Sequence, residues 1–180
     1  MEQTADYFLF NFDRKRIKSY LKKNVTQDEN GIYRLKIALY KYGKLSHSLS
    51  KLPQLHDEVK VMISRNKINS KNSFQYFKTT NRRLYGKEYK KYSSKGFFDV
   101  IFLNEHGELA EGAISNIFIY KNDNVSTPPL TTGILPGVYR KHLLTNNPRI
   151  LERKLHLQDI LEADKIVLTN SVRGEVVVDK

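Results

Sequence analysis

Lys78 is the first of three features of the sequence whose residue types and spacing could support covalent chemistry. It closes an aromatic stretch formed by Phe74, Tyr76 and Phe77, immediately before a predicted helix. Burial against apolar side chains disfavours the charged form of a lysine, so it lowers the pKa below the ordinary value of about 10.4. The resulting neutral amine could form an imine with a carbonyl compound. Taken alone, an ordinary surface lysine at a helix start is the simpler interpretation.

Glu111 belongs to the second feature, residues 108–118, in which small residues follow a carboxylate. Small residues let the backbone pass close to a flat ligand. A carboxylate in such a segment could pair with a protonated ring nitrogen and so hold a pyridinium as an electron sink. The alternative is a glutamate in an exposed turn.

The third feature is residues 127–140, a loop rich in Thr, Pro and Gly that runs into a predicted helix. The first N–H groups of a helix have no partner within it and lie at the positive end of its dipole, so they suit a phosphate group. An ordinary helix start is the alternative. Lysine, glutamate and a phosphate-type helix start, in this order, make a stronger signal than any of the three alone.

Hydrophobic periodicity predicts the elements that must position these features. In the first third, Asp13 is expected to cap a helix over residues 13–23, followed by antiparallel strands at 32–40, at 44–51 and around 59–63, which together form a small α+β layer. Farther along, the predicted elements are helix 80–94, strands 97–103 and 116–120 joined by a turn at 104–107, helix 135–144, strand 150–155, helix 157–163 and strand 165–169.

A polar stretch at residues 66–73 separates the two patterns and contains few apolar side chains. Such composition is typical of a linker between domains. We therefore expect a small N-terminal α+β domain over residues 1–66, an interdomain connection over residues 67–76, and a C-terminal domain over residues 77–180 that carries the three features.

The composition is that of an ordinary soluble protein of 180 residues, 39% of them hydrophobic and 28% charged. No apolar run approaches the roughly 20 residues that a membrane helix needs, and the first six residues lack the basic start and apolar core of a secretory signal. The absence of cysteine excludes disulfides, thiolate zinc sites and cysteine nucleophiles. We expect no metal site, no membrane partner and a cytoplasmic location.

The formal net charge of +12 admits two interpretations. Clustered Lys and Arg could bind nucleic acid through its phosphates. A generally basic surface could instead favour the approach of anionic small molecules and of a phosphate-bearing cofactor. The densest basic groups, at residues 14–23 and 87–95, fall on predicted helices and are most simply solvated faces, so we expect no nucleic-acid partner.

Four segments in order carry a specific resemblance: FKTTNR at 77–82, ELAEGAISNIFI at 108–119, TPPLTTGILPGVYR at 127–140 and LTNSVRG at 168–174. Together they resemble the class IV aminotransferases, the fold-type IV pyridoxal-phosphate enzymes, and within them aminodeoxychorismate lyase most. The resemblance covers about residues 5–178 and is strongest from Phe77 onward. It implies a fold like that of D-amino acid aminotransferase, mixed α+β and α/β, with a small N-terminal α/β layer, here incomplete, and a C-terminal α/β pseudo-barrel domain.

The resemblance also implies residue roles. Lys78 forms the internal aldimine with pyridoxal 5′-phosphate and later moves protons, and Glu111 pairs with the pyridine nitrogen. Ser115 and Asn116 are expected near the cofactor, and Arg173 either meets a substrate carboxylate or is a surface arginine. The phosphate is expected against the backbone of Leu135, Gly137, Val138 and Tyr139, with Asn170 as a further contact to the phosphate or the substrate.

The implied reaction converts 4-amino-4-deoxychorismate to 4-aminobenzoate and pyruvate, a step that feeds folate synthesis. Lys78 removes a ring proton, the cofactor takes up the electron pair, and enolpyruvate leaves as the ring becomes aromatic. The implied partners are a small anionic amine as substrate, a second copy of the chain in a homodimer, and an aminodeoxychorismate synthase.

Two rival functions and one departure accompany this resemblance. A branched-chain or D-amino acid aminotransferase on the same fold is the first rival, but branched-chain enzymes have a tyrosine five positions after the lysine, where this chain has Arg83. The second rival is a non-catalytic basic protein on a decayed enzyme scaffold. The departure is that related enzymes carry further N-terminal strands before the segment that matches residues 4–8, so we expect a truncated or misassigned start.

Overall fold

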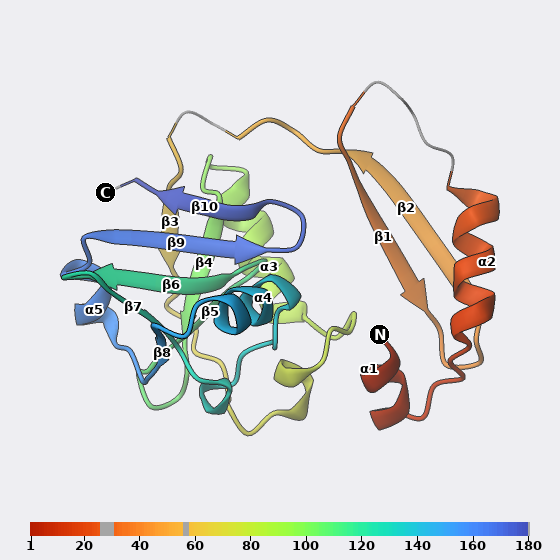
Figure 1. Ribbon diagram of the computed structural model, residues 1–180, viewed down its shortest axis with the longest axis horizontal. Coiled ribbons are helices and arrows are strands. Elements are labelled where there is room, and N and C mark those ends of the chain that lie inside the picture. Colours follow the sequence, from red (N-terminus) through yellow and green to blue (C-terminus); the bar gives the residue numbers. More distant parts are fainter. Residues whose placement is uncertain (26–30, 56–57, 180) are drawn as a thin grey trace. The chain divides into compact units, whose positions relative to one another are not determined.

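The computed structural model describes residues 1–25, 31–55 and 58–179, which form two compact units, Met1–Gln54 and Leu55–Lys180. Each unit has strands that pair within it. Figure 1 labels the helices and strands of both units. Among the described residues, no helix is long and apolar enough to cross a membrane. The division between the units falls at residues 54 and 55, whereas the sequence predicted that the first domain ends at residue 66.

The first unit contains two helices and a β-hairpin. Its elements are α1 (Glu2–Tyr7), α2 (Arg14–Asn24), β1 (Tyr33–Leu39) and β2 (Leu45–Lys51). The Asp13 carboxylate accepts the Arg16 N–H at 3.0 Å, so the predicted cap of this helix is confirmed. The strands pair antiparallel from Tyr33 opposite Lys51 to Leu39 opposite Leu45, as expected for two strands joined by a short turn.

The second unit is built from two sheets and three α-helices in its described part. The three-stranded sheet has the order β3 (Val61–Ile63), β4 (Asp99–Leu103), β5 (Leu109–Gly112), and the five-stranded sheet has the order β10 (Gly174–Val178), β9 (Lys165–Asn170), β6 (Asn116–Lys121), β7 (Asn124–Thr127), β8 (Ile150–Glu152). The helices are α3 (Arg83–Ser93), α4 (Val138–Asn146) and α5 (Leu157–Leu161), and two 3₁₀ turns cover Ser73–Tyr76 and Leu130–Thr132.

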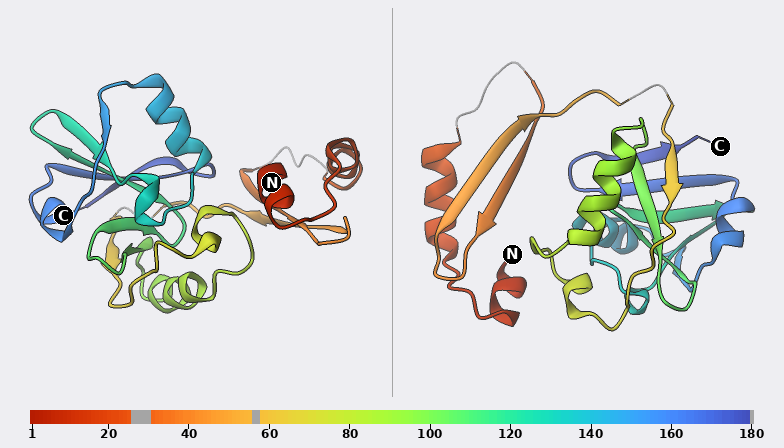
Figure 2. Two further views of the ribbon diagram at one scale, coloured as in Figure 1. Left: turned by 90° about the horizontal axis from the view of Figure 1, so that it is seen from below. Right: turned by 180° about the vertical axis from the view of Figure 1, so that it is seen from behind.

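Strand β4 shows how the core of this unit is arranged, because its alternate side chains belong to two different apolar clusters. Ile101 packs with Ile117 and Leu168 of the five-stranded sheet, so one cluster joins the two sheets. Val100 and Phe102 pack with Tyr85 of α3 in the other cluster. Helix α3 therefore covers one side of the three-stranded sheet, as Figure 2 also shows.

The strand at residues 61–63 is not part of an antiparallel N-terminal sheet, which corrects the sequence interpretation. β3 pairs parallel with β4, with Val61 opposite Asp99 and Ile63 opposite Ile101. Alternation shows that a strand is half-buried, but it does not show which strand is its neighbour. Because of this pairing, the second unit begins nearer the N-terminus than the sequence predicted.

Residues 67–76 also differ from the expected interdomain connection, because they fold within the second unit. Ile68 is 3% exposed and forms an isolated parallel bridge with Asn104. The Ser70 N–H and hydroxyl donate to the Glu105 carboxylate at 2.8 and 2.6 Å, and the Tyr76 hydroxyl donates to the Ser70 carbonyl at 2.8 Å. The polar side chains of this segment bind backbone and neighbouring groups, so they hold the chain in place just before Lys78.

Gly133 passes directly against this segment. A Cβ atom at this position would lie 2.7 Å from the Ser70 Cα, and the backbone φ of Gly133 is +88°, which side-chain-bearing residues rarely adopt. Gly133 therefore lets the loop before α4 approach the segment before Lys78.

We predict that Gly133→Ala lowers the free energy of unfolding more than Gly107→Ala does. Gly107 has a similar φ of +78° but nothing within 4 Å of its added Cβ, so it reports strain alone, about 1–2 kcal/mol. Gly133→Ala adds overpacking against the Ser70 backbone, worth about 1–3 kcal/mol more. Urea unfolding of the full chain, followed by circular dichroism, measures both losses, and equal losses would show that the close approach at Ser70 carries no energetic weight.

Candidate active site

Lys78 lies in an irregular segment between the 3₁₀ turn at Ser73–Tyr76 and the start of α3. More than a third of the residue is exposed to solvent, yet its amine is near enough to other groups for its pKa to be lowered. Desolvation of the amine is the largest cause, and repulsion from the Arg82 guanidinium adds to it, whereas the Glu111 carboxylate acts in the opposite direction. This environment favours the neutral amine that the sequence analysis expected.

Glu111 is a buried residue of β5, with 2% of its surface exposed, and not a glutamate of an exposed turn. Its Oε1 accepts from Arg82 Nη2 at 3.1 Å. Its Oε2 accepts from the Leu135 N–H at 2.9 Å and from Asn116 Nδ2 at 3.4 Å. Burial raises the pKa of Glu111, and the Arg82 charge and the Leu135 hydrogen bond oppose that rise.

Asn116, the first residue of β6, joins Glu111 to the start of α4. Its Nδ2 also donates to the Leu135 carbonyl at 3.0 Å. A Cβ atom added to Gly137 would lie 2.0 Å from the Asn116 Oδ1, so only glycine lets α4 begin this close to β6. The three sequence features, which contain Lys78, Glu111 and Leu135, therefore converge on one region of the second unit.

The start of α4 offers two N–H groups for an anion. No side chain caps the helix at Gly137, and the N–H groups of Val138 and Tyr139 lie in its first turn, where a helix supplies no acceptor. The N–H groups of Leu135 and Gly137 already donate, to Glu111 and to the Leu135 carbonyl at 2.8 Å, respectively. The N–H groups of Leu135 and Gly137 thus have partners within the chain, and their predicted phosphate contacts stay predictions.

Two other predicted site residues, Ser115 and Asn170, make side-chain contacts that are structural. The Ser115 hydroxyl donates to the Asp99 carboxylate at 2.5 Å. The Asn170 side-chain oxygen accepts the N–H groups of Val172 and Arg173, both at 2.9 Å, which closes the turn between β9 and β10. That turn adjoins the start of α4, because a Cβ atom at Gly174 would lie 3.4 Å from the Tyr139 hydroxyl.

Arg82, Tyr85 and Asp99 also lie at or near this region, and none of them was predicted as a site residue. Arg82 pairs with a residue 29 positions away, and nothing in the local pattern predicts that pairing. Asp99 gave a usable signal, because an acid inside the apolar run of residues 97–102 must be buried. It is 0% exposed, and its carboxylate also accepts the N–H groups of Val100 and Ile114 at 2.7 and 3.3 Å.

The residues at this site fit pyridoxal phosphate. The cofactor needs a primary amine for its aldehyde, an anion for its ring nitrogen and donors for its phosphate. Lys78 supplies the amine, Glu111 is a carboxylate that already holds a cation at Oε1, and Val138 and Tyr139 supply donors.

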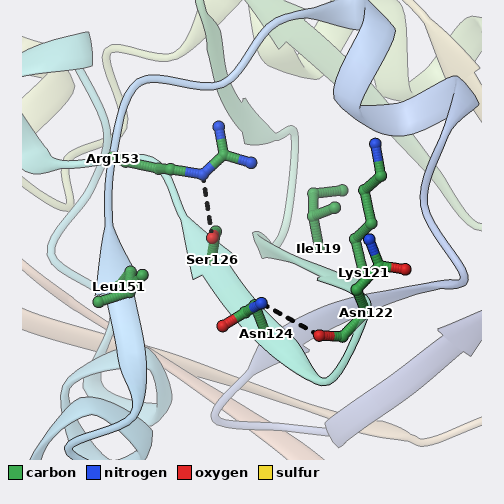
Figure 3. Close-up of a pocket in the computed structure, with 7 residues that line it drawn as sticks. All are labelled: Ile119, Lys121, Asn122, Asn124, Ser126, Leu151 and Arg153. Atoms are coloured by element: carbon green, nitrogen blue, oxygen red, sulfur yellow. Dashed lines mark hydrogen bonds between the residues drawn. The ribbon is translucent and has the colours of Figure 1, made fainter.

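Figure 3 shows residues that line a hollow elsewhere in the second unit, and none of them was predicted for the site. The hollow has a volume of about 340 Å³. It lies at the β6–β7 hairpin, where Arg153 Nε donates to the Ser126 hydroxyl at 3.1 Å. Its two cationic side chains, Lys121 and Arg153, already pair with Glu162 and Asp159. Both cations of this hollow are therefore already neutralised by carboxylates of the chain.

Comparison with known proteins finds one family and several relatives. Residues 1–180 match the family model for amino-transferase class IV. Aminodeoxychorismate lyase of Bacillus subtilis (strain 168) is 47% identical over 76 residues, which cover 40% of this chain and 26% of the lyase. Branched-chain-amino-acid aminotransferase 3 of Arabidopsis thaliana is 34% identical over 84 residues, which cover 43% of this chain and 20% of that enzyme. The segments matched therefore span about a quarter or less of these two relatives.

A solved structure matches over nearly the whole chain. The crystal structure of a Mesorhizobium loti protein assigned as an amino-acid aminotransferase superposes with a TM-score of 0.84 at 28% identity, over 99% of this chain and 86% of that chain. This match confirms the expected fold class.

We predict that Asp99 makes the stability of the protein fall as pH rises from about 4 to about 7. Burial raises the pKa of Asp99 to about 7 in the folded protein, against about 3.9 when unfolded. Between these values the folded state holds a proton that the unfolded state has lost, so ionisation favours unfolding. The loss is on the order of a few kcal/mol, at about 1.36 kcal/mol per pKa unit.

Urea unfolding at a series of pH values measures this slope. Asp99→Asn cannot ionise, so its stability should change less between pH 4 and pH 7 than that of the wild type. Exposed Asp123→Asn is the matched control and should keep the wild-type slope. A wild-type slope in Asp99→Asn would contradict the assignment.

Proposed function

The chain belongs to the class IV aminotransferase family, whose members are pyridoxal-phosphate-dependent enzymes, and we propose that it binds pyridoxal 5′-phosphate at Lys78, Glu111 and the start of α4. One observation carries the proposal. The buried Glu111 carboxylate is hydrogen-bonded to the segment that follows Lys78 and to the loop that opens α4. A single carboxylate thus brings together a free amine and a helix start suited to phosphate.

The chain's own residues divide the work of the site. Bound pyridoxal phosphate supplies an aldehyde for a primary amine and a ring that accepts an electron pair. Lys78 Nζ offers the amine, and once displaced it can take or return a proton. Glu111 presents a negative charge to a ring nitrogen, and the first N–H groups of α4 orient an anion.

The proposed reaction is that of a lyase, which converts 4-amino-4-deoxychorismate to 4-aminobenzoate and pyruvate. Lys78 removes the ring proton, the C–O bond to enolpyruvate breaks, and the ring becomes aromatic. The 47% identity to aminodeoxychorismate lyase over 76 residues supports this choice, as does Arg83 where branched-chain enzymes carry tyrosine. Arg173 is proposed to meet a substrate carboxylate.

Transamination of branched-chain or D-amino acids is the second candidate. The 34% identity to a branched-chain-amino-acid aminotransferase over 84 residues favours it. Both candidates use the same amine and carboxylate, so they differ in substrate contacts rather than in the residues that hold the cofactor. If the chain is a lyase, we propose that it acts as a homodimer in the cytoplasm and receives its substrate from an aminodeoxychorismate synthase.

We predict that the full chain, mixed with pyridoxal phosphate, develops an absorbance band at the edge of the visible range that borohydride removes by reduction. Lys78→Ala should lack this band, because it has no amine at the site. Exposed Lys87→Ala on α3 is the matched control and should keep it. A borohydride-sensitive band of wild-type strength in Lys78→Ala would overturn the assignment of Lys78.

We also predict that the chain releases pyruvate from 4-amino-4-deoxychorismate without any added keto acid. Lys78→Ala should lower the rate by about 10²–10⁴-fold or more, because it removes the general base. Glu111→Gln should bind cofactor but turn over more slowly, because a neutral amide cannot balance a ring cation. Product formation that requires a keto acid would instead support the transaminase.

A further inference from the structure

Arg82 occupies a fixed position beside the two groups that define the proposed site. It is the N-cap residue of α3, and its side chain is 19% exposed. The guanidinium carbon lies 4.0 Å from the centre of the Tyr85 ring, and Nη2 lies 3.1 Å from Glu111 Oε1. Both contacts favour a cation in this place.

Tyr85 gives the guanidinium a rigid support. Its ring is 4% exposed and packs against Phe102 of β4 at 4.6 Å between ring centres. Its hydroxyl donates to the Gln75 side chain at 2.8 Å, which fixes the orientation of the ring. Arg82 is therefore held by a well-packed neighbour on one side and by a buried carboxylate on the other.

The charge of Arg82 acts on both neighbours in the direction that the chemistry needs. Among the described charged groups, Arg82 and Glu111 are the two whose charges move the pKa of Lys78, and Arg82 lowers it. The same charge opposes the rise in the pKa of Glu111 that burial causes. One guanidinium thus favours a neutral amine and an ionised carboxylate within the same site.

We propose that Arg82 is a positioning residue of the active site, a role that rests on the proposed function: stacked on Tyr85 and paired with Glu111, its guanidinium orients the carboxylate and places a fixed positive charge in the site. Glu111 Oε2 accepts hydrogen bonds from Leu135 and Asn116, whereas Oε1 accepts from Arg82. Arg82 need not touch the reacting atoms to do this.

The test measures the reactivity of the Lys78 amine without any cofactor. The full-length chain is treated briefly with acetic anhydride across a range of pH, and mass spectrometry gives the acetylation rate of Lys78 relative to exposed Lys87. The anhydride reacts with the neutral amine alone, so the rate follows its population. The wild type is compared with Arg82→Gln, with Arg82→Lys, which keeps the charge, and with Arg83→Gln, which removes the same charge from the neighbouring exposed position.

Arg82→Gln should lower the relative acetylation of Lys78 at neutral pH by roughly threefold or more and move its pH profile to higher pH, because repulsion is lost while Glu111 remains. Arg82→Lys and Arg83→Gln should stay close to the wild type. A purely structural role for Arg82 would not distinguish the lysine from the glutamine variant.

The same profile in Arg82→Gln as in Arg83→Gln would overturn the role of Arg82, while the proposed cofactor site would stand. Wild-type Lys78 that reacts no faster than Lys87 would also overturn it, and would count against Lys78 itself. Should Arg82→Gln fail to fold, Arg82→Lys still decides the question, because loss of Lys78 reactivity despite the retained charge contradicts the proposal.

Discussion

The buried carboxylate of Glu111 is the interaction on which the site depends. An ionised group with 2% exposure is stable only when it is paired and hydrogen-bonded, since burial of a lone charge is costly. Three partners of Glu111 come from different parts of the second unit: Arg82 before α3, Asn116 at the start of β6, and Leu135 before α4. The need to satisfy one carboxylate therefore fixes the amine-bearing segment relative to the helix start that suits a phosphate.

The arrangement of the site also requires that backbone segments approach one another closely. Glycine permits this at three positions. Gly137 lets α4 begin against Asn116, and Gly133 lets the preceding loop lie on Ser70. Gly112 faces the Asp99 carboxylate, where an added Cβ would lie 2.2 Å from Oδ2. Asp99 in turn holds Ser115 and Ile114, so the strand that carries Glu111 ends in a turn anchored by a second buried acid. The glycines let the backbone approach the two buried acids closely enough for their hydrogen bonds to form.

Much of this arrangement could be predicted from the sequence, and the failures have physical causes. Alternation located β1, apolar runs located β6 and β9, and the apolar periodicity located α2 and α3. β5 was missed because its sequence, Leu-Ala-Glu-Gly, contains no β-branched residue and ends in glycine, so its strand conformation comes from pairing with β4. β3 was placed with the wrong neighbours, because alternation carries no information about pairing.

The site shows the same limit. Lys78, Glu111 and the α4 start could be singled out because each has a local chemical signature. Arg82 could not, because its pairing with Glu111 exists only in the folded chain. The use of the Leu135 N–H by Glu111, and of the Asn170 oxygen by the turn before β10, likewise depends on tertiary contacts and turn geometry. Residue types thus predict the chemistry, and the fold decides which atoms remain available for it.

The most direct test of the account is to locate the covalent attachment. The full chain is loaded with pyridoxal phosphate, reduced with borohydride, digested and mapped by mass spectrometry. The account predicts that the phosphopyridoxyl group is found on Lys78 at close to one equivalent and that other lysines carry little. Modification spread over exposed lysines, with Lys78 no more modified than Lys87, would contradict the claim that this convergence of Lys78, Glu111 and α4 is a cofactor site.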